Sequence, residues 1–388
     1  MDRKIVTQRP ENSETPLDHL RSWVTPTRLF FVRNHFDPPA VDLAAWRLEV
    51  GGLVARPRAW TWDELADLPE RTVLATVECA GNGRSFLREK VRGVQWGAGA
   101  IGHAEWTGIP LRLILERAGL LDDALEILCE GADRGSEADH PEAMAFERSL
   151  PLAKALDPDT LLATRMNGEP LEPIHGFPLR LFVPGWYGVA SVKWLTKITA
   201  LREPFRGYYQ YDHYTVKRQT ATGVERVVVG PMQVKSEIVV PRDGAVLGRG
   251  TNRIFGVAWA GDEPVARVEV STDGGATWRD AELVGPRAPY SWTLWEQLWD
   301  AATPGRYAIA ARATSASGVT QPREHDPGNG GYQIHHVRSI AITVEGAREA
   351  HARRADHDTL VYDMNAFAED NMRMPLDVDL EFEGGGGI

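Results

Sequence analysis

The chain has 388 residues, more than one hydrophobic core usually supports, so its length predicts two domains. It carries 43 Lys and Arg residues against 54 Asp and Glu residues, and this net charge of −11 argues against nucleic acid or an anionic membrane as its main partner. Its two cysteines, Cys79 and Cys129, exclude a disulfide framework, a cysteine-rich zinc module, a four-thiolate iron–sulfur cluster and a CxxCH haem attachment.

The first residues are polar, and no apolar stretch in the sequence approaches the roughly 18 residues needed to span a bilayer. We therefore expect a cytoplasmic protein without membrane contact, and the sequence leaves a periplasmic location open. Residues 1–24 are expected to form a solvated N-terminal arm.

The segment 25–230 interleaves strand and helix patterns without a strict βαβ alternation, which predicts an α+β domain. Its predicted strands cover 29–32, 46–50, 72–77, 125–129 and 178–183. A capping box at Thr61–Glu64 predicts a short helix, and an amphipathic pattern predicts a second helix over 111–118. Polar loops are expected after three of the strands, at 33–35, at 78–84 and around Asp133.

The pattern changes near Gly230, and the segment 231–346 consists of short alternating strands and turns. In 265–271 the apolar residues Ala266, Val268 and Val270 are expected to face inward, and in 338–345 the inward residues are expected at 340, 342 and 344. The sequence Asp273-Gly-Gly275 predicts a hairpin turn. These features predict a sandwich of two antiparallel sheets. The acidic tail 347–388 begins with a predicted helix over 348–354, and its end is expected to be mobile.

Cys79 follows a predicted strand and lies in the Gly/Asn-rich loop Glu78-Cys-Ala-Gly-Asn-Gly-Arg84. Backbone N–H groups and the nearby Arg84 favour a thiolate, which is the form that binds a soft metal or an electrophile. The position alone also fits a small buried apolar side chain, because free cysteine is among the most buried residue types. Cys129 lies within an apolar strand and is expected to be structural.

Several cationic side chains fall in or beside turns at strand ends. They are Arg33, His35, Arg84, His175, Arg180 and Lys193. Arginine forks match oxyanions in a bidentate manner, so their convergence would create an anion pocket in an otherwise acidic protein. Each of them could instead pair with a surface carboxylate, and the sequence leaves both possibilities open.

Trp96, in a glycine-containing loop, and Tyr214, at the end of a tyrosine-rich run, could wall a small polar site. Packing in a core or an interface is the alternative for both residues. The sequence contains no dinucleotide-binding glycine motif, no P-loop, no HExxH and no GxSxG, so nucleotide-dependent and serine hydrolase chemistry lose support.

Taken together, the motifs resemble those of the sulfite oxidase family of molybdenum enzymes. The resemblance runs in family order from residue 28 to 345. It is carried by Phe31-Val-Arg-Asn-His35, Glu78-Cys-Ala-Gly-Asn-Gly-Arg84, Met166-Asn-Gly-Glu-Pro170, His175-Gly-Phe-Pro-Leu-Arg180, Val183-Pro-Gly185, Ser191-Val-Lys-Trp194, Val234-Lys-Ser236 and Ser271-Thr-Asp-Gly-Gly-Ala-Thr-Trp278. It implies a mixed α/β molybdopterin-binding domain over 25–230, followed by an all-β immunoglobulin-like dimerisation domain over 231–346, and hence a homodimer.

The resemblance implies that Cys79 ligates molybdenum beside the dithiolene of one molybdopterin per chain. It implies cofactor contacts for Val32, Arg33, Asn34, His35, Asp133, His175, Arg180, Ser191, Val192 and Lys193. It implies a substrate pocket that contains Arg33, Arg84, Trp96 and Tyr214. Many relatives have a second arginine at the position of Gly83, so the substrate geometry is expected to differ here. No cytochrome b5-like segment is recognised in the sequence, and no haem is expected.

The implied reaction is oxygen-atom transfer that oxidises sulfite to sulfate and passes electrons to an external acceptor, a cytochrome or another soluble carrier. Arg33 and Arg84 would hold the dianion, Tyr214 would hydrogen-bond the substrate, and Trp96 would wall the pocket. Two alternatives remain at this point. One is a related reaction on another oxo-substrate, such as nitrate reduction, and the other is a non-catalytic binding protein that holds no metal.

Overall fold

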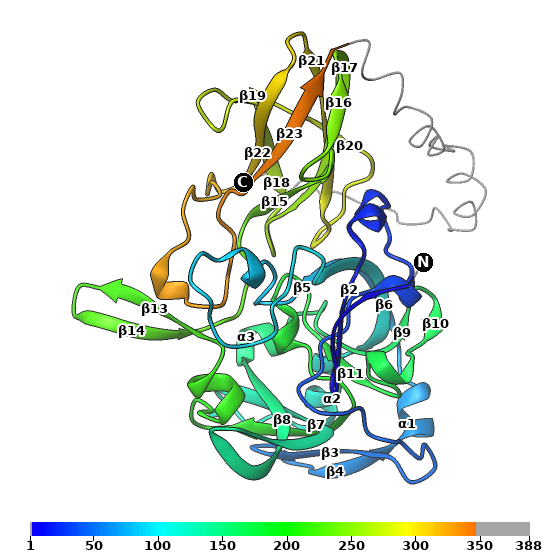
Figure 1. Cartoon of the computed structure of the whole chain (residues 1–388). Coiled ribbons are helices and arrows are strands. Elements are labelled where there is room, and N and C mark those ends of the chain that lie inside the picture. Colours follow the sequence, from blue (N-terminus) through cyan, green and yellow to red (C-terminus); the bar gives the residue numbers. More distant parts are fainter. Residues whose placement is uncertain (1, 347–388) are drawn as a thin grey trace, which may run out of the picture.

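The computed structural model describes residues 2–346, and these form an α+β part below a β-sandwich (Figure 1). The predicted helix over 348–354 and the acidic tail lie outside the described residues. No helix among residues 2–346 is both long and apolar enough to cross a membrane. The two-part architecture confirms the fold class expected from the sequence.

The α+β part contains two five-stranded sheets. The first has the order β10-β9-β6-β5, with β11 also paired to β9, and consists of β5 (Arg71–Glu78), β6 (Ile101–Pro110), β9 (Leu161–Met166), β10 (Glu169–Pro170) and β11 (Arg180–Phe182). The second has the order β4-β3-β12-β7-β8 and consists of β3 (Arg47–Gly52), β4 (Arg58–Thr61), β7 (Glu126–Glu137), β8 (His140–Pro151) and β12 (Leu195–Leu201). Tyr214 ends the connection from this sheet to a separate hairpin, β13 (Thr215–Thr220) and β14 (Gly223–Val228), which projects to the side in Figure 1.

Short helices connect these strands. The α-helices are α1 (Trp62–Ala66), α2 (Leu111–Ala118) and α3 (Leu152–Ala155). The 3-10 turns are η1 (Leu17–Arg21), η2 (Thr27–Leu29), η3 (Arg84–Phe86), η4 (Pro173–His175), η5 (Gly188–Ala190) and η7 (Pro327–Asn329), and η6 (Tyr208–Asp212) is a π-helical turn. The predicted capping box is confirmed, because the Thr61 hydroxyl accepts from the Glu64 N–H while the Glu64 carboxylate accepts from the Thr61 N–H.

Two expectations for this part were wrong. The segment 29–32 is not a strand, because it follows the turn η2 and only Val32 pairs, in an isolated bridge with Ser13. Asp133 does not lie in a loop, because β7 continues through it to Glu137. The polar residues of this stretch alternate with buried ones along β7, and the pairing with β8 shifts register between Glu130 and Arg134, so a bulge surrounds Asp133.

The upper part is the expected sandwich of two sheets. One sheet has the order β15-β17-β21-β20 and consists of β15 (Lys235–Val240), β17 (Gly250–Trp259), β20 (Glu282–Val284) and β21 (Thr293–Ala301). The other has the order β16-β23-β22-β18-β19 and consists of β16 (Val246–Gly248), β18 (Val265–Ser271), β19 (Arg279–Asp280), β22 (Gly305–Ser315) and β23 (Ser339–Glu345). Ile340, Ile342 and Val344 face the core as predicted. Ala266 is exposed, against expectation, because the register of β18 with β22 shifts between Val265 and Arg267.

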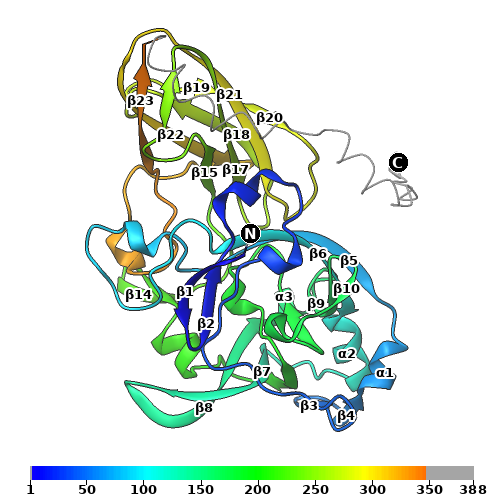
Figure 2. The same ribbon diagram turned by 45° about the vertical axis from the view of Figure 1, so that its right-hand side comes forward.

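The N-terminal arm is not solvated, contrary to expectation. It forms a hairpin, β1 (Lys4–Gln8) and β2 (Glu11–Glu14), that packs against the α+β part (Figure 2), and the residues from Asn12 to Thr15 are buried. Ser13 exchanges both backbone hydrogen bonds with Val32, and the Thr15 N–H donates to the Gly99 carbonyl over 2.9 Å. The polar composition of this arm therefore serves hydrogen bonds to the protein rather than to water.

The two parts of the chain share buried contacts. The turn η1 packs against β15 and β17, and Asp18 pairs with Arg242. The Trp292 indole donates to the Trp23 carbonyl over 3.1 Å. His103, which is fully buried, links the same region, since its Nδ1 contacts the Trp23 carbonyl and its Nε2 lies 2.9 Å from the Ser291 hydroxyl.

His103 should make the stability of the protein sensitive to acid. Burial lowers the pKa of His103 to about 4, below the value of about 6.5 in an unfolded chain, so the unfolded state binds the proton first as the pH falls. Its contribution is complete above pH 6.5 and decreases toward pH 4, and about 2 kcal/mol should be lost between pH 7 and 5. Urea unfolding at both pH values should show a smaller loss for His103→Gln than for the parent. An equal loss would contradict this assignment.

Candidate active site

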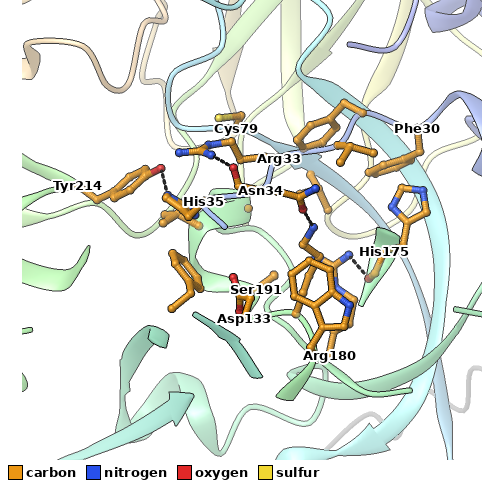
Figure 3. Close-up of a pocket in the computed structure, with 18 residues that line it drawn as sticks. Phe30, Arg33, Asn34, His35, Cys79, Asp133, His175, Arg180, Ser191 and Tyr214 are labelled. Carbon is orange, nitrogen blue, oxygen red and sulfur yellow. Dashed lines mark hydrogen bonds between the residues drawn. The ribbon is translucent and has the colours of Figure 1, made fainter. Parts of the chain in front are cut away.

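A pocket lies between the two sheets of the α+β part and is walled by residues from distant parts of the chain (Figure 3). Eleven of the residues singled out in the sequence line it: Val32, Arg33, Asn34, His35, Cys79, Asp133, His175, Arg180, Ser191, Lys193 and Tyr214. Phe30, Phe31, Val77, Phe146, Val189 and Trp194 add apolar walls. The sequence could not show this convergence, and the structure does.

Cys79 reaches the pocket because β5 ends at Glu78 and the chain turns sharply after it. The turn is closed by the Asn82 N–H, which donates to the Cys79 carbonyl over 2.8 Å, and Gly83 then adopts a φ of 93°. A Cβ at Gly81 would lie 2.4 Å from Nη2 of Arg84, so a larger residue there would displace the Arg84 guanidinium. Burial raises the pKa of the Cys79 thiol, opposed by the positive charge of Arg33, the Gly81 N–H and Arg84. Bound metal would remove its proton.

Arg33, Asn34 and His35 form the wall next to this turn, and the Arg33 side chain lies beside Cys79 (Figure 3). The Asn34 N–H donates to Oδ1 of Asn12 over 2.9 Å, and its side-chain amide donates to the Glu11 carbonyl over 3.1 Å. Nη1 of Arg33 donates to the same Asn12 oxygen over 3.3 Å and also to the Asn34 carbonyl. The N-terminal hairpin therefore holds this wall in place.

Lys193, Arg180 and His175 form a cationic corner of the pocket. The Lys193 ammonium donates to Oδ1 of Asn34 and, over 3.0 Å, to the Ile174 carbonyl. Nη1 of Arg180 donates to the His175 carbonyl over 3.0 Å, and Nε of Arg180 has no hydrogen-bond partner among residues 2–346. Oδ1 of Asp133, whose carboxylate lies near enough to Lys193 for their charges to interact, likewise lacks a hydrogen-bond partner within the described chain.

The protonation states follow from burial at this corner. Burial lowers the pKa of Arg180 to about 9 and, with the positive charge of Arg180, holds that of Lys193 well below its usual value. Burial and the charges of Lys193 and Arg180 lower the pKa of His175 to about 3, so it is neutral. Burial raises the pKa of Asp133 to about 7. The corner thus concentrates cations that an anionic ligand would stabilise.

His35 and Tyr214 meet on the opposite side of the pocket, where Nε2 of His35 lies 2.8 Å from the Tyr214 hydroxyl (Figure 3). Burial and the charges of Arg33 and Lys193 lower the pKa of His35 far below its usual value, so its ring is neutral. Burial alone would lower the pKa of Arg33. Its electrostatic interactions with Tyr214 and Cys79 outweigh this effect, so the pKa of Arg33 is raised. Tyr214 has a φ of 51°, an unusual value for a tyrosine, which marks this position as constrained.

Three of the candidate residues lie outside the pocket lining. Arg84 donates to the Gly331 carbonyl through Nη2 and to the Val94 carbonyl through Nη1, both over 2.8 Å. Trp96 is fully buried in the core behind Cys79. The side chain of Val192 is buried in the larger core, and its carbonyl accepts from the Leu181 N–H. Substrate contacts of Arg84 and Trp96 and a cofactor contact of Val192 stay predictions.

Asn12 is the residue that the sequence analysis missed. It lies in a polar segment without apolar alternation, and its partners become visible only in the folded chain. Asn12→Ala should leave the Asn34 N–H and Arg33 Nη1 without their shared acceptor, at a cost of about 1–3 kcal/mol.

The Asn12→Ala variant should also retain less of any ligand bound at this wall, and dialysis followed by assay of the bound ligand measures that loss. Asn252→Ala is the matched control, because Asn252 also makes two backbone hydrogen bonds, in the sandwich. Equal ligand retention in the two variants would contradict a role of Asn12 at the pocket.

The donor set points to a particular class of ligand. No group of three or more His, Cys, Asp or Glu side chains within residues 2–346 is arranged to hold a metal ion. Cys79 lines the pocket and can offer one thiolate ligand to a metal that a cofactor carries. The cationic corner and the unpartnered Nε of Arg180 fit the anionic part of such a cofactor, and Oδ1 of Asp133 fits an N–H donor.

Comparisons with known proteins agree with this chemistry. A family model described as an oxidoreductase molybdopterin binding domain matches residues 35–209, and one described as a Mo-co oxidoreductase dimerisation domain matches residues 226–328. The chain is similar to the mitochondrial sulfite oxidase of Homo sapiens (37% identity, 76% of this chain and 56% of that protein) and to the sulfite oxidase of Gallus gallus (36% identity, 82% and 72%). The chain thus spans little more than half the length of the human enzyme.

Two further similarities widen the range of activities. An inducible nitrate reductase of Glycine max is 33% identical over 83% of this chain and 40% of its own length. The solved structure of the sulfane dehydrogenase SoxCD of Paracoccus pantotrophus has a TM-score of 0.77 and 28% identity, and the match covers 89% of this chain and 90% of that one.

Proposed function

Because this chain belongs to the sulfite oxidase family of molybdopterin-dependent oxidoreductases, we propose that it oxidises sulfite to sulfate and passes the electrons to an external acceptor. The observation that carries the proposal is the convergence of the Cys79 thiol with Arg33, Arg180 and Lys193 on one pocket. The chain as a whole has a net charge of −11, so this cationic pocket favours an anionic substrate and cofactor locally.

The residues fit the molybdenum–molybdopterin cofactor. Cys79 would supply the thiolate ligand, Arg180 and Lys193 would bind the anionic phosphate, and Asp133 would accept from the pterin. When bound, this cofactor supplies the oxygen atom and takes up two electrons. Hydrogen bonds around a ligand thiolate tune the metal further, and here the Gly81 N–H and Arg33 influence the Cys79 sulfur.

The substrate would be held by the opposite side of the pocket. The half-buried, protonated Arg33 would bind the dianion and stabilise charge as it develops on oxygen. The neutral ring of His35 would orient the Tyr214 hydroxyl toward the substrate through their 2.8 Å hydrogen bond. Phe31 and Val189 add apolar surface that limits access of water to this side.

The test of the proposal begins with the metal. Full-length protein from a host that makes the cofactor should contain about one molybdenum per chain, and it should reduce an artificial electron acceptor when sulfite is added. A molybdenum content near zero would favour the binding-protein alternative and would overturn the proposal.

Two other substrates compete with sulfite within the family. The similarity to a nitrate reductase supports nitrate, and the match to a sulfane dehydrogenase, which spans nearly all of both chains, supports a sulfane-sulfur compound. Parallel assays with sulfite, a sulfane-sulfur compound and nitrate, the last with an artificial donor, separate the three. The sulfite proposal is wrong if either competitor gives the higher kcat/KM.

We further propose that the sandwich forms a homodimer, on the support of the dimerisation-domain match, and that a cytochrome or another soluble carrier accepts the electrons. Light scattering during gel filtration tests the dimer, and a monomer at micromolar concentration would contradict it. The cytoplasmic location and the four segment boundaries stay predictions from the sequence.

A further inference from the structure

A buried ion pair lies directly behind Cys79, and neither partner lines the pocket. Glu78 ends β5 and immediately precedes Cys79, and Lys235 begins β15 of the sandwich. Their charged atoms Oε1 and Nζ are 2.8 Å apart. Side-chain exposure is only 2% for Glu78 and 6% for Lys235, so solvent does not weaken this pair.

The Glu78 carboxylate is fully engaged. Its Oε1 also accepts from the Asn82 side-chain amide over 3.1 Å, and its Oε2 accepts from the Trp259 indole over 2.9 Å. Lys235 and Trp259 come from β15 and β17, so the sandwich supplies two of the three donors. Each carboxylate oxygen is therefore fixed by a strand of the upper part of the molecule.

The same network continues to the far side of Cys79. The Asn82 N–H closes the turn onto the Cys79 carbonyl, and Oδ1 of Asn82 accepts from the Ala100 N–H over 3.0 Å. The Cys79 N–H donates to the Ala100 carbonyl over 2.9 Å. Cys79 is thus held through its own backbone, through the residue before it and through the turn after it.

We propose that Lys235 is a positioning residue, which acts through Glu78 and Asn82 to fix the direction in which Cys79 presents its sulfur to the pocket. A buried ion pair adds little net stability, because a pair of apolar residues of similar volume often stabilises the folded protein equally well. The ion pair does, however, fix the positions of its two side chains. The role as a metal-ligand support rests on the function proposed above. The contacts that define the network are independent of that function.

The experiment compares Glu78→Gln, Lys235→Met and the double variant in full-length protein from a host that does not make the cofactor, so that the Cys79 sulfur is free to react. Iodoacetamide labelling of Cys79 is followed by peptide mass, with the fully buried Cys129 as the internal reference. Lys235→Met leaves the buried Glu78 carboxylate without a counter-charge, so the melting temperature should fall by on the order of 10 °C. The labelling rate of Cys79 at 20 °C should rise on the order of tenfold through local opening of the turn.

The double variant separates positioning from charge balance. Removing both charges should restore most of the melting temperature, but Cys79 should still be labelled faster than in the parent because the pair geometry is lost. If the double variant restores both the melting temperature and the labelling rate, Lys235 only neutralises Glu78 and the proposal is wrong.

Arg312→Met supplies the matched control. Arg312 pairs with the buried Glu269 through two hydrogen bonds of 2.8 and 3.0 Å, within the sandwich and away from the pocket. It should lower the melting temperature without changing the labelling of Cys79. Equal labelling of the Arg312 and Lys235 variants would overturn the proposal. The molybdenum content of the parent, measured in protein from a host that makes the cofactor, reports separately on the proposed function.

Discussion

Cys79→Ser should abolish the proposed sulfite oxidation while the protein stays folded. The substitution keeps the size of the side chain in the pocket wall, so the free energy of unfolding should change by about 1 kcal/mol or less. It removes the soft sulfur that a molybdenum centre needs from the protein. Turnover with an artificial acceptor should fall below detection, and circular dichroism should show an unchanged spectrum.

Cys129→Ser is the control for this prediction. Cys129 is fully buried in the larger core, where burial alone raises the pKa of its thiol. A serine hydroxyl there would be buried in an apolar environment without a hydrogen-bond partner, which should cost about 1–3 kcal/mol of stability. Turnover per folded molecule should remain at the parental level. If Cys79→Ser oxidises sulfite at the parental rate, Cys79 is not the metal ligand.

Arg180→Met should weaken cofactor retention and at the same time stabilise the cofactor-free chain. Burial lowers the pKa of Arg180 to about 9. The charged form of Arg180 therefore disfavours the folded state at every pH below the pKa of arginine in the unfolded chain. Methionine removes this penalty but also one hydrogen bond to the His175 carbonyl and the stacking over Trp106, which leaves a gain of about 1 kcal/mol.

Retention of the cofactor should move in the opposite direction. Charge-assisted hydrogen bonds to an anion contribute about 1.5–3 kcal/mol, so molybdenum should dissociate roughly 10- to 100-fold faster from Arg180→Met during dialysis. Arg165→Met, at an exposed position on the neighbouring strand β9, should change neither property. The prediction is wrong if the cofactor-free Arg180→Met chain is less stable than the cofactor-free parent, or if the variant retains molybdenum as well as the parent does. Either result would show that the charge of Arg180 does not serve to bind the ligand.

The sequence predicted the sandwich because some of its strands alternate between exposed and buried residues, most clearly β23. The alternation from Ser339 to Glu345 follows the pleat without interruption. The prediction failed for Ala266 because a register shift places it on the outer face, and a bulge leaves no clear mark in the order of apolar residues.

The candidate site was predictable as a set of residue types, because ordered motifs carried the family resemblance. Its spatial arrangement was less predictable. Five of the six candidate cations line one pocket. The sixth, Arg84, instead donates hydrogen bonds to the carbonyls of Val94 and Gly331. Asn12 was missed because long-range hydrogen bonds, rather than apolar burial, fix its position.

The network behind Cys79 also has a consequence for the time at which the protein can acquire its ligand. A ribosome that adds about 5–20 residues per second reaches Trp259 roughly 10–40 s after Glu78. During that interval the Glu78 carboxylate of the nascent chain has neither the Lys235 ammonium nor the Trp259 indole to bind. The turn that carries Cys79 acquires its complete set of hydrogen bonds only after both strands have been synthesised and folded. A ligand of Cys79 should therefore meet the completed turn only after β15 and β17 have been synthesised and have folded against it.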